Sequence, residues 1–574
     1  MEKVNITIDG QKVQVAKTAT ILEAASQIGV NIPTLCYHPE LRPEGACRVC
    51  MVEVEGARTL VASCVYPVNE GMVVRTNSAS IREARKMVVE LLLANHPQDC
   101  LSCQRNLNCE LQTIAGDLGI RKVRFDGERK KYPLDASNPS LVRDQEKCIL
   151  CGRCIRACSE RQGVHVYSFV SRGFNTTVAP AFSQGLDEAA CTYCGQCAAV
   201  CPTGAIVEKD DTDAVWQVLS DPTKHVIVQT APSVRVALGE ALGMGHGQIV
   251  TGQMVAALRR LGFDRVFDTD FSADLTILEE GHEFIHRLTH GGKLPMITSC
   301  SPGWVNFIEL FYPDLLDHLS TAKSPQQMFG ALVKTYYAET AGIDPKDIVS
   351  VSIMPCTAKK AEAAREEMAT EGGQDVDYVL TTRELGRMIR ETGMDFVNLP
   401  SEKFDAPMGI ATGAGVIFGA TGGVMEAALR TVSEVVTGKP LECIDFHGVR
   451  GLAGMKEAEV SLDGTVVKVA VAHTLANARL ILEKIRRGEA DYHFIEIMAC
   501  PGGCIGGGGQ PVPISADIRQ KRIDLIYECD QSHEFRKSHD NPAIKELYDT
   551  WLGKPNGEKA HHILHTHYQQ QKRQ

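Results

Sequence analysis

Cysteine is the residue type whose number and spacing suggest chemistry in this chain of 574 residues. The chain holds 21 cysteines, and 15 of them lie between Cys36 and Cys201. Runs with the spacing CxxCxxCxxxC are typical of iron–sulfur clusters, whereas CxxC pairs also form tetrahedral zinc sites. Disulfides are not expected, because no secretion signal is visible and cytoplasmic thiols are kept reduced. We therefore predict iron–sulfur clusters in a cytoplasmic protein.

Two of the cysteine runs form an internal repeat between residues 147 and 206. In two-cluster ferredoxins the fourth cysteine of each run ligates the cluster of the other run. One predicted 4Fe–4S cluster therefore takes Cys148, Cys151, Cys154 and Cys201. The other takes Cys158, Cys191, Cys194 and Cys197.

Two further ligand sets precede this repeat. The first has the spacing C-x10-C-x2-C-x13-C and is similar to a plant-type 2Fe–2S ferredoxin with altered intervals, with zinc as the alternative. Its members are Cys36, Cys47, Cys50 and Cys64. The second has three cysteines and lacks a fourth, which a nearby histidine can replace because cluster iron accepts imidazole. This predicted 4Fe–4S set is His96, Cys100, Cys103 and Cys109.

Three later segments combine cysteine with unusual neighbours. They read TSCSPGW at 298–304, MPCTAKKAE at 354–362 and EIMACPGGCIGGGGQP at 496–511. The glycines around Cys500 and Cys504 let the backbone approach a bulky ligand closely, and Cys356 would close such a site from another segment. The isolated Cys443 and Cys529 are expected to be packed or surface thiols.

Periodic patterns predict the elements that position these residues. Val4–Ile8 and Lys12–Val15 alternate like strands, and Thr20–Ile28 has helical spacing. An amphipathic helix is expected from Ser78 to Asn95, directly before His96. His225–Thr230 is an apolar strand that opens a long stretch of alternating strands and helices.

The predicted fold class is α+β multidomain, because a chain of this length exceeds one core. Its predicted parts are a β-grasp 2Fe–2S ferredoxin-like domain (1–78), a one-histidine three-cysteine 4Fe–4S domain (79–125), a two-cluster 4Fe–4S ferredoxin domain (138–210), a large α/β domain (211–515) and a helical C-terminal segment (516–574).

Composition excludes several function classes. The net charge of −11 without a long basic block argues against nucleic acid as a partner. Gly409–Leu429 is the longest weakly polar stretch, but its glycines and Glu426 place it inside a domain, so no membrane span is predicted. Its glycine spacing also differs from GxGxxG, so nucleotide binding within this chain is not expected. The final histidines are expected on a solvated helix: His561, His562, His565 and His567.

The three later cysteine segments together resemble the signature segments of the iron-only, or FeFe, hydrogenases. With the cluster domains, the resemblance covers nearly the whole chain and implies either the long clostridial-type monomeric enzyme or the catalytic subunit of an NAD(P)-linked complex. Such enzymes interconvert H2 with protons and electrons at an H-cluster. This cofactor is a 4Fe–4S cube joined to a di-iron centre with CO, cyanide and a dithiolate amine. The expected cofactors are therefore one 2Fe–2S cluster, three accessory 4Fe–4S clusters and the H-cluster, held by 211–515.

The resemblance assigns Cys356, Cys500 and Cys504 to the cube, with Cys504 as the bridge to the di-iron unit. The family usually has two adjacent cysteines where this chain has Cys300 and Ser301, the first relaying protons and the second ligating the cube. Either Cys300 ligates the cube and the relay passes through Ser301 or water, or Ser301 supplies an oxygen ligand, or the site is altered and slow. Thiolate suits iron–sulfur clusters better than serine oxygen, so Cys300 is an expected site residue.

The resemblance also implies a proton path and a pocket around the diatomic ligands. The path residues are Cys300, Glu280, Ser320, Glu283 and Arg287, although Glu280, Glu283 and Arg287 could also form an ordinary solvated helix face. The implied pocket residues are Pro232, Ser233, Gln326, Met354, Lys359 and Met498, and Lys359 could instead form a surface salt bridge.

The expected electron partner is ferredoxin or a flavin/NAD(P) subunit, with neither nucleic acid nor membrane as a partner. The N-terminal modules also resemble part of respiratory complex I, which favours as an alternative the hydrogen-handling subunit of an NAD(P)-dependent or bifurcating complex. A second alternative is an iron–sulfur hydrogen sensor or scaffold, which Ser301 leaves open.

Overall fold

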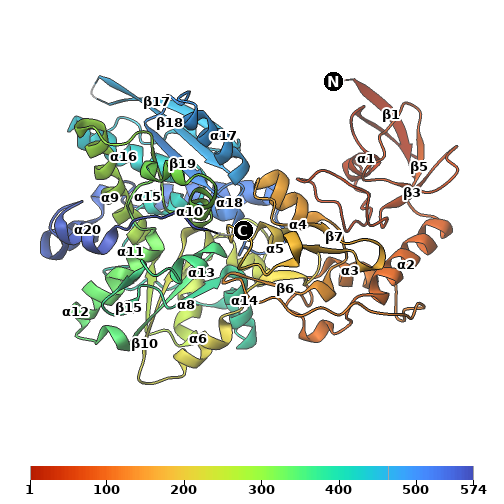
Figure 1. Cartoon of the computed structure of the whole chain (residues 1–574), viewed down its shortest axis with the longest axis horizontal. Coiled ribbons are helices and arrows are strands. Elements are labelled where there is room, and N and C mark those ends of the chain that lie inside the picture. Colours follow the sequence, from red (N-terminus) through yellow and green to blue (C-terminus); the bar gives the residue numbers. More distant parts are fainter. Residues whose placement is uncertain (1, 463, 573–574) are drawn as a thin grey trace.

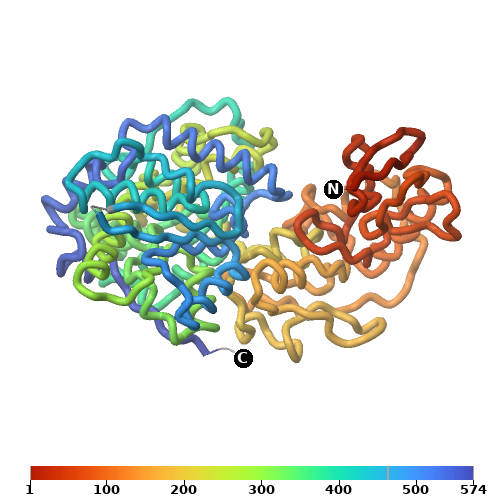
Figure 2. The backbone as a smooth tube through the Cα atoms, turned by 90° about the horizontal axis from the view of Figure 1, so that it is seen from above, coloured from red at the N-terminus to blue at the C-terminus, as the bar shows by residue number. Residues whose placement is uncertain are grey.

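The structure is a computed structural model that describes residues 2–462 and 464–572. Met1 and the last two residues, at the ends of the predicted parts 1–78 and 516–574, lie outside the described residues. Figures 1 and 2 show an elongated molecule, with the red and orange N-terminal modules at one end and the green to blue α/β part at the other.

The N-terminal module is a five-stranded sheet with the strand order β2-β1-β5-β3-β4. Its strands are β1 (Lys3–Ile8), β2 (Gln11–Ala16), β3 (Met51–Val54), β4 (Val61–Ala62) and β5 (Val73–Arg75). Its helix α1 (Ile21–Gln27) starts with a capping box, in which Thr20 and Glu23 satisfy each other's backbone amides. The strands and the helix predicted for this module are confirmed.

Two cluster modules connect the sheet to the rest of the chain. α2 (Ala79–Ala94) starts at the capping serine Ser78, as predicted, and packs against α3 (Glu110–Asp117). The internal repeat is visible in the backbone, because α4 (Arg153–Arg156) and α5 (Gln196–Val200) each follow a glycine with positive φ. The strands here are β6 (Leu141–Arg143), β7 (Ser168–Val170), β8 (Thr177–Ala179) and β9 (Ile206–Glu208).

The α/β part is built on two four-stranded sheets, which confirms a multidomain fold with both helices and strands. The first has the order β11-β10-β13-β16 and is parallel throughout. Its strands are β10 (His225–Thr230), β11 (Arg265–Asp268), β13 (Ile348–Met354) and β16 (Tyr378–Thr381). The second has the order β12-β19-β18-β17, with only β17 antiparallel. Its strands are β12 (Met296–Ile297), β17 (Met455–Leu462), β18 (Thr465–His473) and β19 (Phe494–Met498).

Helices surround both sheets and bury apolar cores between the layers. The long ones are α8 (Thr251–Leu261), α9 (Thr269–His290), α10 (Pro302–Phe311), α14 (Thr382–Glu391), α16 (Gly423–Thr437) and α17 (Leu475–Arg486). The shorter elements are α6 (Thr212–Leu219), α7 (Leu238–Ala241), α11 (Pro325–Leu332), α12 (Ala338–Ala341), α13 (Ala358–Ala363), β14 (Ala369–Thr370), β15 (Gly373–Gln374) and α15 (Gly413–Val416). No helix in the described part of the chain is long and apolar enough to cross a membrane.

Four loops that carry predicted site residues begin at the carboxyl ends of parallel strands. They are 231–233 after β10, 298–301 after β12, 355–357 after β13 and 499–509 after β19. Ligands of open parallel sheets bind at this edge, because the loops there converge. The sheets therefore bring together segments that lie far apart in the sequence.

The C-terminal segment consists of α18 (Ala516–Ser532), α19 (Pro542–Leu547) and α20 (Glu558–Leu564). Buried polar contacts attach it to the α/β part, including Asn541 Nδ2 to Asp274 Oδ2 at 2.9 Å and His565 Nε2 to Glu279 Oε2 at 3.0 Å. The expectation of solvated histidines is therefore wrong for His565, which is 6 % exposed, because the buried Glu279 carboxylate requires a partner. His561, His562 and His567 are exposed, as expected.

Glycines allow the two-cluster module to touch the α/β part backbone to backbone. A Cβ added at Gly508 would lie 2.5 Å from the Cys194 carbonyl oxygen and 2.8 Å from the Gly195 Cα. Two hydrogen bonds cross the same contact, from Thr357 Oγ1 to the Tyr193 carbonyl at 2.7 Å and from Gln196 Nε2 to the Gly506 carbonyl at 3.1 Å. Only a residue without a side chain fits at position 508.

Replacing Gly508 by alanine should therefore force these two backbones apart. We expect Gly508→Ala to destabilise the protein by roughly 1–3 kcal/mol, the usual cost of overpacking, and to lower the apparent melting temperature under anaerobic conditions. Gly116→Ala is the matched control, because nothing lies within 4 Å of its added Cβ in α3. An unchanged melting temperature for Gly508→Ala would show that the contact is not tight.

Candidate functional site

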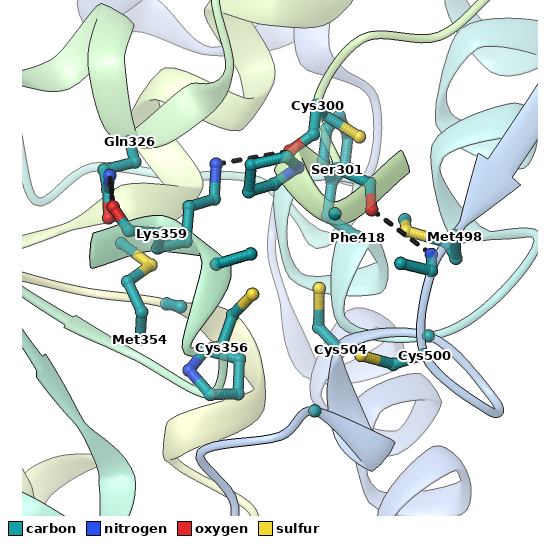
Figure 3. Close-up of a pocket in the computed structure, with 18 of the residues that line it drawn as sticks. Cys300, Ser301, Gln326, Met354, Cys356, Lys359, Phe418, Met498, Cys500 and Cys504 are labelled. Carbon is teal, nitrogen blue, oxygen red and sulfur yellow. Dashed lines mark hydrogen bonds between the residues drawn. The ribbon is translucent and has the colours of Figure 1, made fainter. Parts of the chain in front are cut away.

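The loops at the strand ends enclose a cavity of about 790 Å³ (Figure 3). Its walls carry all the motif cysteines of the α/β part and most of the pocket residues predicted from the sequence. The predicted residues that line it are Pro232, Cys300, Ser301, Gln326, Met354, Cys356, Lys359, Met498, Cys500 and Cys504. The structure thus gathers residues from four strand-end loops and from α11 and α13 into one site.

Cys356, Cys500 and Cys504 face one another across this cavity. Burial raises the pKa of all three thiols, that of Cys504 to about 12, and the charge of a Cys356 thiolate further raises the pKa of Cys500 and Cys504. Three thiolates at this place therefore need a bound cationic centre to stabilise their charge. Gly503 has φ +91°, and a Cβ there would lie 2.6 Å from the Thr421 amide nitrogen, so glycine sets the path of the loop between Cys500 and Cys504. This donor set and cradle suit an iron–sulfur cube.

Cys300 and Ser301 are neighbours in sequence but point in different directions. The Ser301 Oγ accepts a hydrogen bond from the Ala499 amide at 3.2 Å, next to Cys500. The Cys300 thiol points away from the three cysteines, and burial and then the Glu280 carboxylate raise its pKa. The two side chains therefore serve different sides of the cavity.

Lys359 lies in the cavity wall rather than at the surface. Its Nζ donates to Ser324 Oγ at 2.7 Å, to Glu362 Oε2 at 2.8 Å and to the Cys300 carbonyl at 3.2 Å. Gln326 bonds to the same Glu362 carboxylate at 3.1 Å. The ammonium group is therefore held in place by buried acceptors, and the surface salt bridge considered from the sequence is wrong.

Ser233 supplies an unused polar group beside the cavity. It follows Pro232 in a single 3-10 turn after β10, and its Oγ is buried without a hydrogen-bond partner among the described residues. A buried hydroxyl without a partner is costly unless a ligand accepts its hydrogen bond. Ser233 thus fits a pocket that binds a polar diatomic ligand, while Met354 and Met498 supply the apolar wall.

The predicted proton-path residues lie on and beside α9, and the Glu280 charge contributes to the raised pKa of Cys300. Both Glu280 carboxylate oxygens are buried without a hydrogen-bond partner among the described residues. Glu280, Glu283 and Arg287 share α9, and Ser320 Oγ donates to Glu283 Oε2 at 2.8 Å. Arg287 donates to Glu283 Oε1 at 2.5 Å and is partly exposed. Burial and the neighbouring Glu283 carboxylate raise the pKa of Glu280 to about 8, although the Ser320 hydroxyl opposes this. Because Glu280 is fully buried, this face of α9 is not an ordinary solvated face.

The N-terminal ligand sets are also assembled in the structure. The Cys36 amide donates to the Cys47 sulfur at 3.4 Å, and the Cys47 amide donates to the Cys36 sulfur at 3.5 Å. The Cys50 and Cys64 sulfurs are 3.4 Å apart. The second set lines a cavity of about 290 Å³ with His96, Cys100, Cys103 and Cys109. The His96 Nδ1 is buried without a partner in the described residues, and burial lowers the pKa of His96 to about 4. Its imidazole is therefore neutral at pH 7, the form that binds metal.

The crossed arrangement of the two-cluster repeat is present as well. One cavity of about 440 Å³ is lined by Cys148, Cys151, Cys154 and Cys201. The pKa of Cys197 is raised by burial and then by the nearby thiolates of Cys194, Cys191 and Cys158. Cys194 in addition lines the large cavity beside Cys500, so this set lies next to the three facing cysteines.

Sequence reasoning missed three contributors to the site. Phe418 forms part of the cavity wall, although its glycine-rich segment was assigned only to a domain interior. Ser324 and Glu362 hold Lys359, and for Glu362 the three-residue spacing from Lys359 on one helix was an available signal. For Phe418 and Ser324 no pattern in the sequence indicates the contact.

Family models match almost the whole chain in consecutive segments. The matches are iron only hydrogenase large subunit, C-terminal domain (224–508); iron hydrogenase small subunit (516–571); 2Fe-2S iron-sulfur cluster binding domain (1–79); NADH-ubiquinone oxidoreductase-G iron-sulfur binding region (85–124); and 4Fe-4S dicluster domain (147–205).

Relatives and solved structures agree with these matches. NADP-reducing hydrogenase subunit HndD of Solidesulfovibrio fructosivorans is 53% identical, with 99% of both chains covered. Iron hydrogenase 1 of Clostridium pasteurianum is 41% identical over 98% of this chain and 99% of that protein. The structure of apo FeFe-hydrogenase HydA1 from Chlamydomonas reinhardtii is similar with a TM-score of 0.57 and 47% identity, covering 63% of this chain and 99% of that one.

The fold and the cysteine sites define a multi-cluster iron–sulfur oxidoreductase with a buried catalytic cavity. With the comparisons, the chain belongs to the iron-only (FeFe) hydrogenase family. It is an enzyme with accessory 2Fe–2S and 4Fe–4S domains and an H-cluster domain, and the resemblance predicted from its motifs is confirmed.

The position of His96 predicts distinct effects for two substitutions. His96→Ala should lose or destabilise its cluster, because a methyl group cannot bind iron. His96→Cys should keep the cluster at a lower reduction potential, because a thiolate adds negative charge that a neutral imidazole lacks. Redox titration followed by electron paramagnetic resonance (EPR) measures both effects.

His539→Ala is the control, since His539 bonds to Thr431 and Glu434 away from the cysteine sets. If all reduced-cluster signals were unchanged in His96→Ala, His96 would not be a ligand.

Proposed function

We propose that this chain is the hydrogen-handling subunit of an NAD(P)-linked hydrogenase, and that a separate partner subunit binds the nucleotide. The supporting observation is the match over 99% of both chains to a protein named an NADP-reducing hydrogenase subunit. The chain itself lacks a GxGxxG motif, so the nucleotide site belongs to the partner. Ferredoxin is the second candidate partner, because the monomeric clostridial enzyme is matched over nearly the same length.

The cavity residues divide into those that hold the H-cluster and those that surround it. Cys356, Cys500 and Cys504 would bind its cube, and Ser233 and Lys359 would donate hydrogen bonds to its cyanide ligands. The H-cluster supplies the redox-active iron at which H2 and protons interconvert. Pro232, Gln326, Met354 and Met498 would shape the pocket and exclude water.

Electrons would leave through the accessory sets in the order in which the fold arranges them. Cys194 lines the cavity, so the cluster of Cys158, Cys191, Cys194 and Cys197 would exchange electrons with the cube first. The set with Cys201 would follow, because Arg105 of the His96 cavity donates to the Cys201 carbonyl at 3.0 Å. The 2Fe–2S and histidine-ligated modules would then be the terminals that face the partner.

Protons would travel on the other side of the cavity. Glu283, held by the Arg287 guanidinium, would receive a proton near the surface, Ser320 would pass it to Glu280, and Glu280 would pass it to the Cys300 thiol. With its pKa raised to about 8, Glu280 is mostly protonated at pH 7 and can donate. Lys359 positions the Cys300 backbone through the bond to its carbonyl.

A direct test uses the matured chain without other subunits. We expect infrared bands of bound CO and cyanide and H2-dependent reduction of a viologen dye, but no reduction of NADP+ until a flavin-containing partner is added. Reduction of NADP+ by the chain alone would contradict the assignment of the nucleotide site to the partner. Absence of the infrared bands would contradict the H-cluster assignment.

The raised pKa of Glu280 predicts a pH dependence of hydrogen evolution. Evolution should decline as the pH rises through about 8, because the carboxyl group loses the proton that it donates. Glu280→Gln should reduce turnover on the order of 10²- to 10⁴-fold, with the CO and cyanide bands retained. The assay is hydrogen evolution from reduced viologen across this pH range.

Asp274→Asn is the matched control for Glu280→Gln. Asp274 is a buried carboxyl on the same helix with its pKa raised to about 6 by burial, but it bonds to Thr412 and Asn541 and lies outside the path. Equal activity of Glu280→Gln and the wild type would exclude Glu280 as a proton carrier.

A further inference from the structure

We propose that the Ser301 hydroxyl oxygen is the fourth protein ligand of the iron–sulfur cube, and that Cys300 does not bind it. The inference rests on the proposed H-cluster site and names one of its ligands. A cube has four iron atoms that need protein ligands, and Cys356, Cys500 and Cys504 supply three. Besides these three, the thiol and hydroxyl side chains that line the cavity in the described chain are those of Cys194, Thr269, Cys300 and Ser301. Thr269 Oγ1 already donates to Gln229 Oε1 at 3.0 Å, which leaves Cys194, Cys300 and Ser301 as candidates.

Two of these candidates are directed elsewhere. Cys194 belongs with Cys158, Cys191 and Cys197 in the neighbouring set. The Cys300 thiol points away from the three cysteines, and after burial the Glu280 carboxylate is the largest contributor to its raised pKa. The Cys300 carbonyl accepts from Lys359 Nζ at 3.2 Å, which holds the backbone at this position.

Ser301, in contrast, points toward Cys500 and Cys504 (Figure 3). Its Oγ accepts the Ala499 amide hydrogen at 3.2 Å, and in the described chain it donates to no acceptor. The hydroxyl proton is thus not engaged, and it leaves to solvent when the oxygen forms its bond to iron as an alkoxide. The Ala499 amide would then stabilise the charged oxygen.

The helix that begins after Ser301 does not use the Ser301 hydroxyl. Ser301 is the N-cap of α10, but its side chain makes no capping hydrogen bond. Ser324, the N-cap of α11, makes none either, and its hydroxyl accepts from Lys359 and donates to Glu362 at the cavity instead. The N-cap serines of α2 and α18, Ser78 and Ser515, in contrast accept from the third helical amide. The start of α10 also carries a partial positive charge, which favours an anionic oxygen at this position.

An alkoxide ligand would give the cube a distinct electronic character. Oxygen is a harder and more electron-donating ligand than sulfur, so it stabilises the oxidised cluster. The reduction potential of the cube should therefore be lower with Ser301 than with a cysteine at the same position.

The test uses the full chain produced without the di-iron unit, so that activity plays no part. The wild type should contain about 18 iron atoms, counting the cube and four accessory clusters. Ser301→Ala should lose the iron atom that has no cysteine ligand, which leaves about 17 iron atoms and, after oxidation, the EPR signal of a 3Fe–4S cluster. If the variant keeps this iron atom, the EPR signal of the cube should be altered. Ser301→Cys should keep all the iron and raise the potential of the cube.

Cys300→Ala is the matched control and should leave both the iron content and the cube signal unchanged. Ser301→Ala with full iron content and an unchanged cube signal would overturn the proposal, as would loss of iron in Cys300→Ala alone. The accessory-cluster signals report in each variant whether the chain has folded. Infrared bands of the matured wild type test the proposed function separately, so failure of one leaves the other standing.

Discussion

The organisation of the whole molecule depends on a backbone contact that leaves no room for a side chain. Gly508 meets the Cys194 carbonyl and Gly195 directly, and this contact joins a cluster module to the catalytic cavity. Cys194 can line that cavity only because nothing bulkier lies between. The N-terminal modules contact this module, where Arg153 binds Glu110, and they also contact later parts of the chain directly. These direct contacts are Asn108 Nδ2 to the Val512 carbonyl at 3.5 Å and the ion pair of Arg519 with Glu40. In the proposed function, electrons would pass between the two-cluster module and the cavity where the two loops meet.

In the proposed function, electrons and protons would reach the cavity from separate sides. The cysteines of the two-cluster module lie beside Cys500, whereas Cys300 turns toward Glu280 and α9. Arg287 is paired with Glu283, and burial, followed by the Glu283 carboxylate, raises the pKa of Glu280 and favours its protonated form. The low dielectric of the protein interior favours the neutral form of Glu280. For the same reason, the thiolates of Cys356, Cys500 and Cys504 need a bound metal centre to stabilise their charge.

The sequence indicated the candidate metal-binding residues more clearly than the residues that surround them. Cysteine spacing, helical periodicity and strand alternation are local signals, and they predicted the cysteine sets, α2 and β10, of which the structure contains the helix and the strand. Contacts that depend on tertiary packing have no local pattern. Phe418 in the cavity wall and the pairing of His565 with Glu279 are of this kind. The different orientations of Cys300 and Ser301 also required the structure, because adjacent residues in a loop have no fixed relation between their side chains.

Noncovalent side-chain contacts hold the C-terminal segment after residue 515 on the α/β part. These contacts do not require that the two parts belong to one chain. Arg522 binds Glu240, Asn541 binds Asp274 and His565 binds Glu279, and each pair is buried between this segment and the α/β part. The segment also matches a family described as a small subunit. Because the segment belongs to the same chain, its effective concentration at the α/β part is high. These residue pairs determine how it is positioned there. Gene fusion or fission at this point would thus change whether the enzyme assembles from one chain or from two, while the buried contacts stay the same.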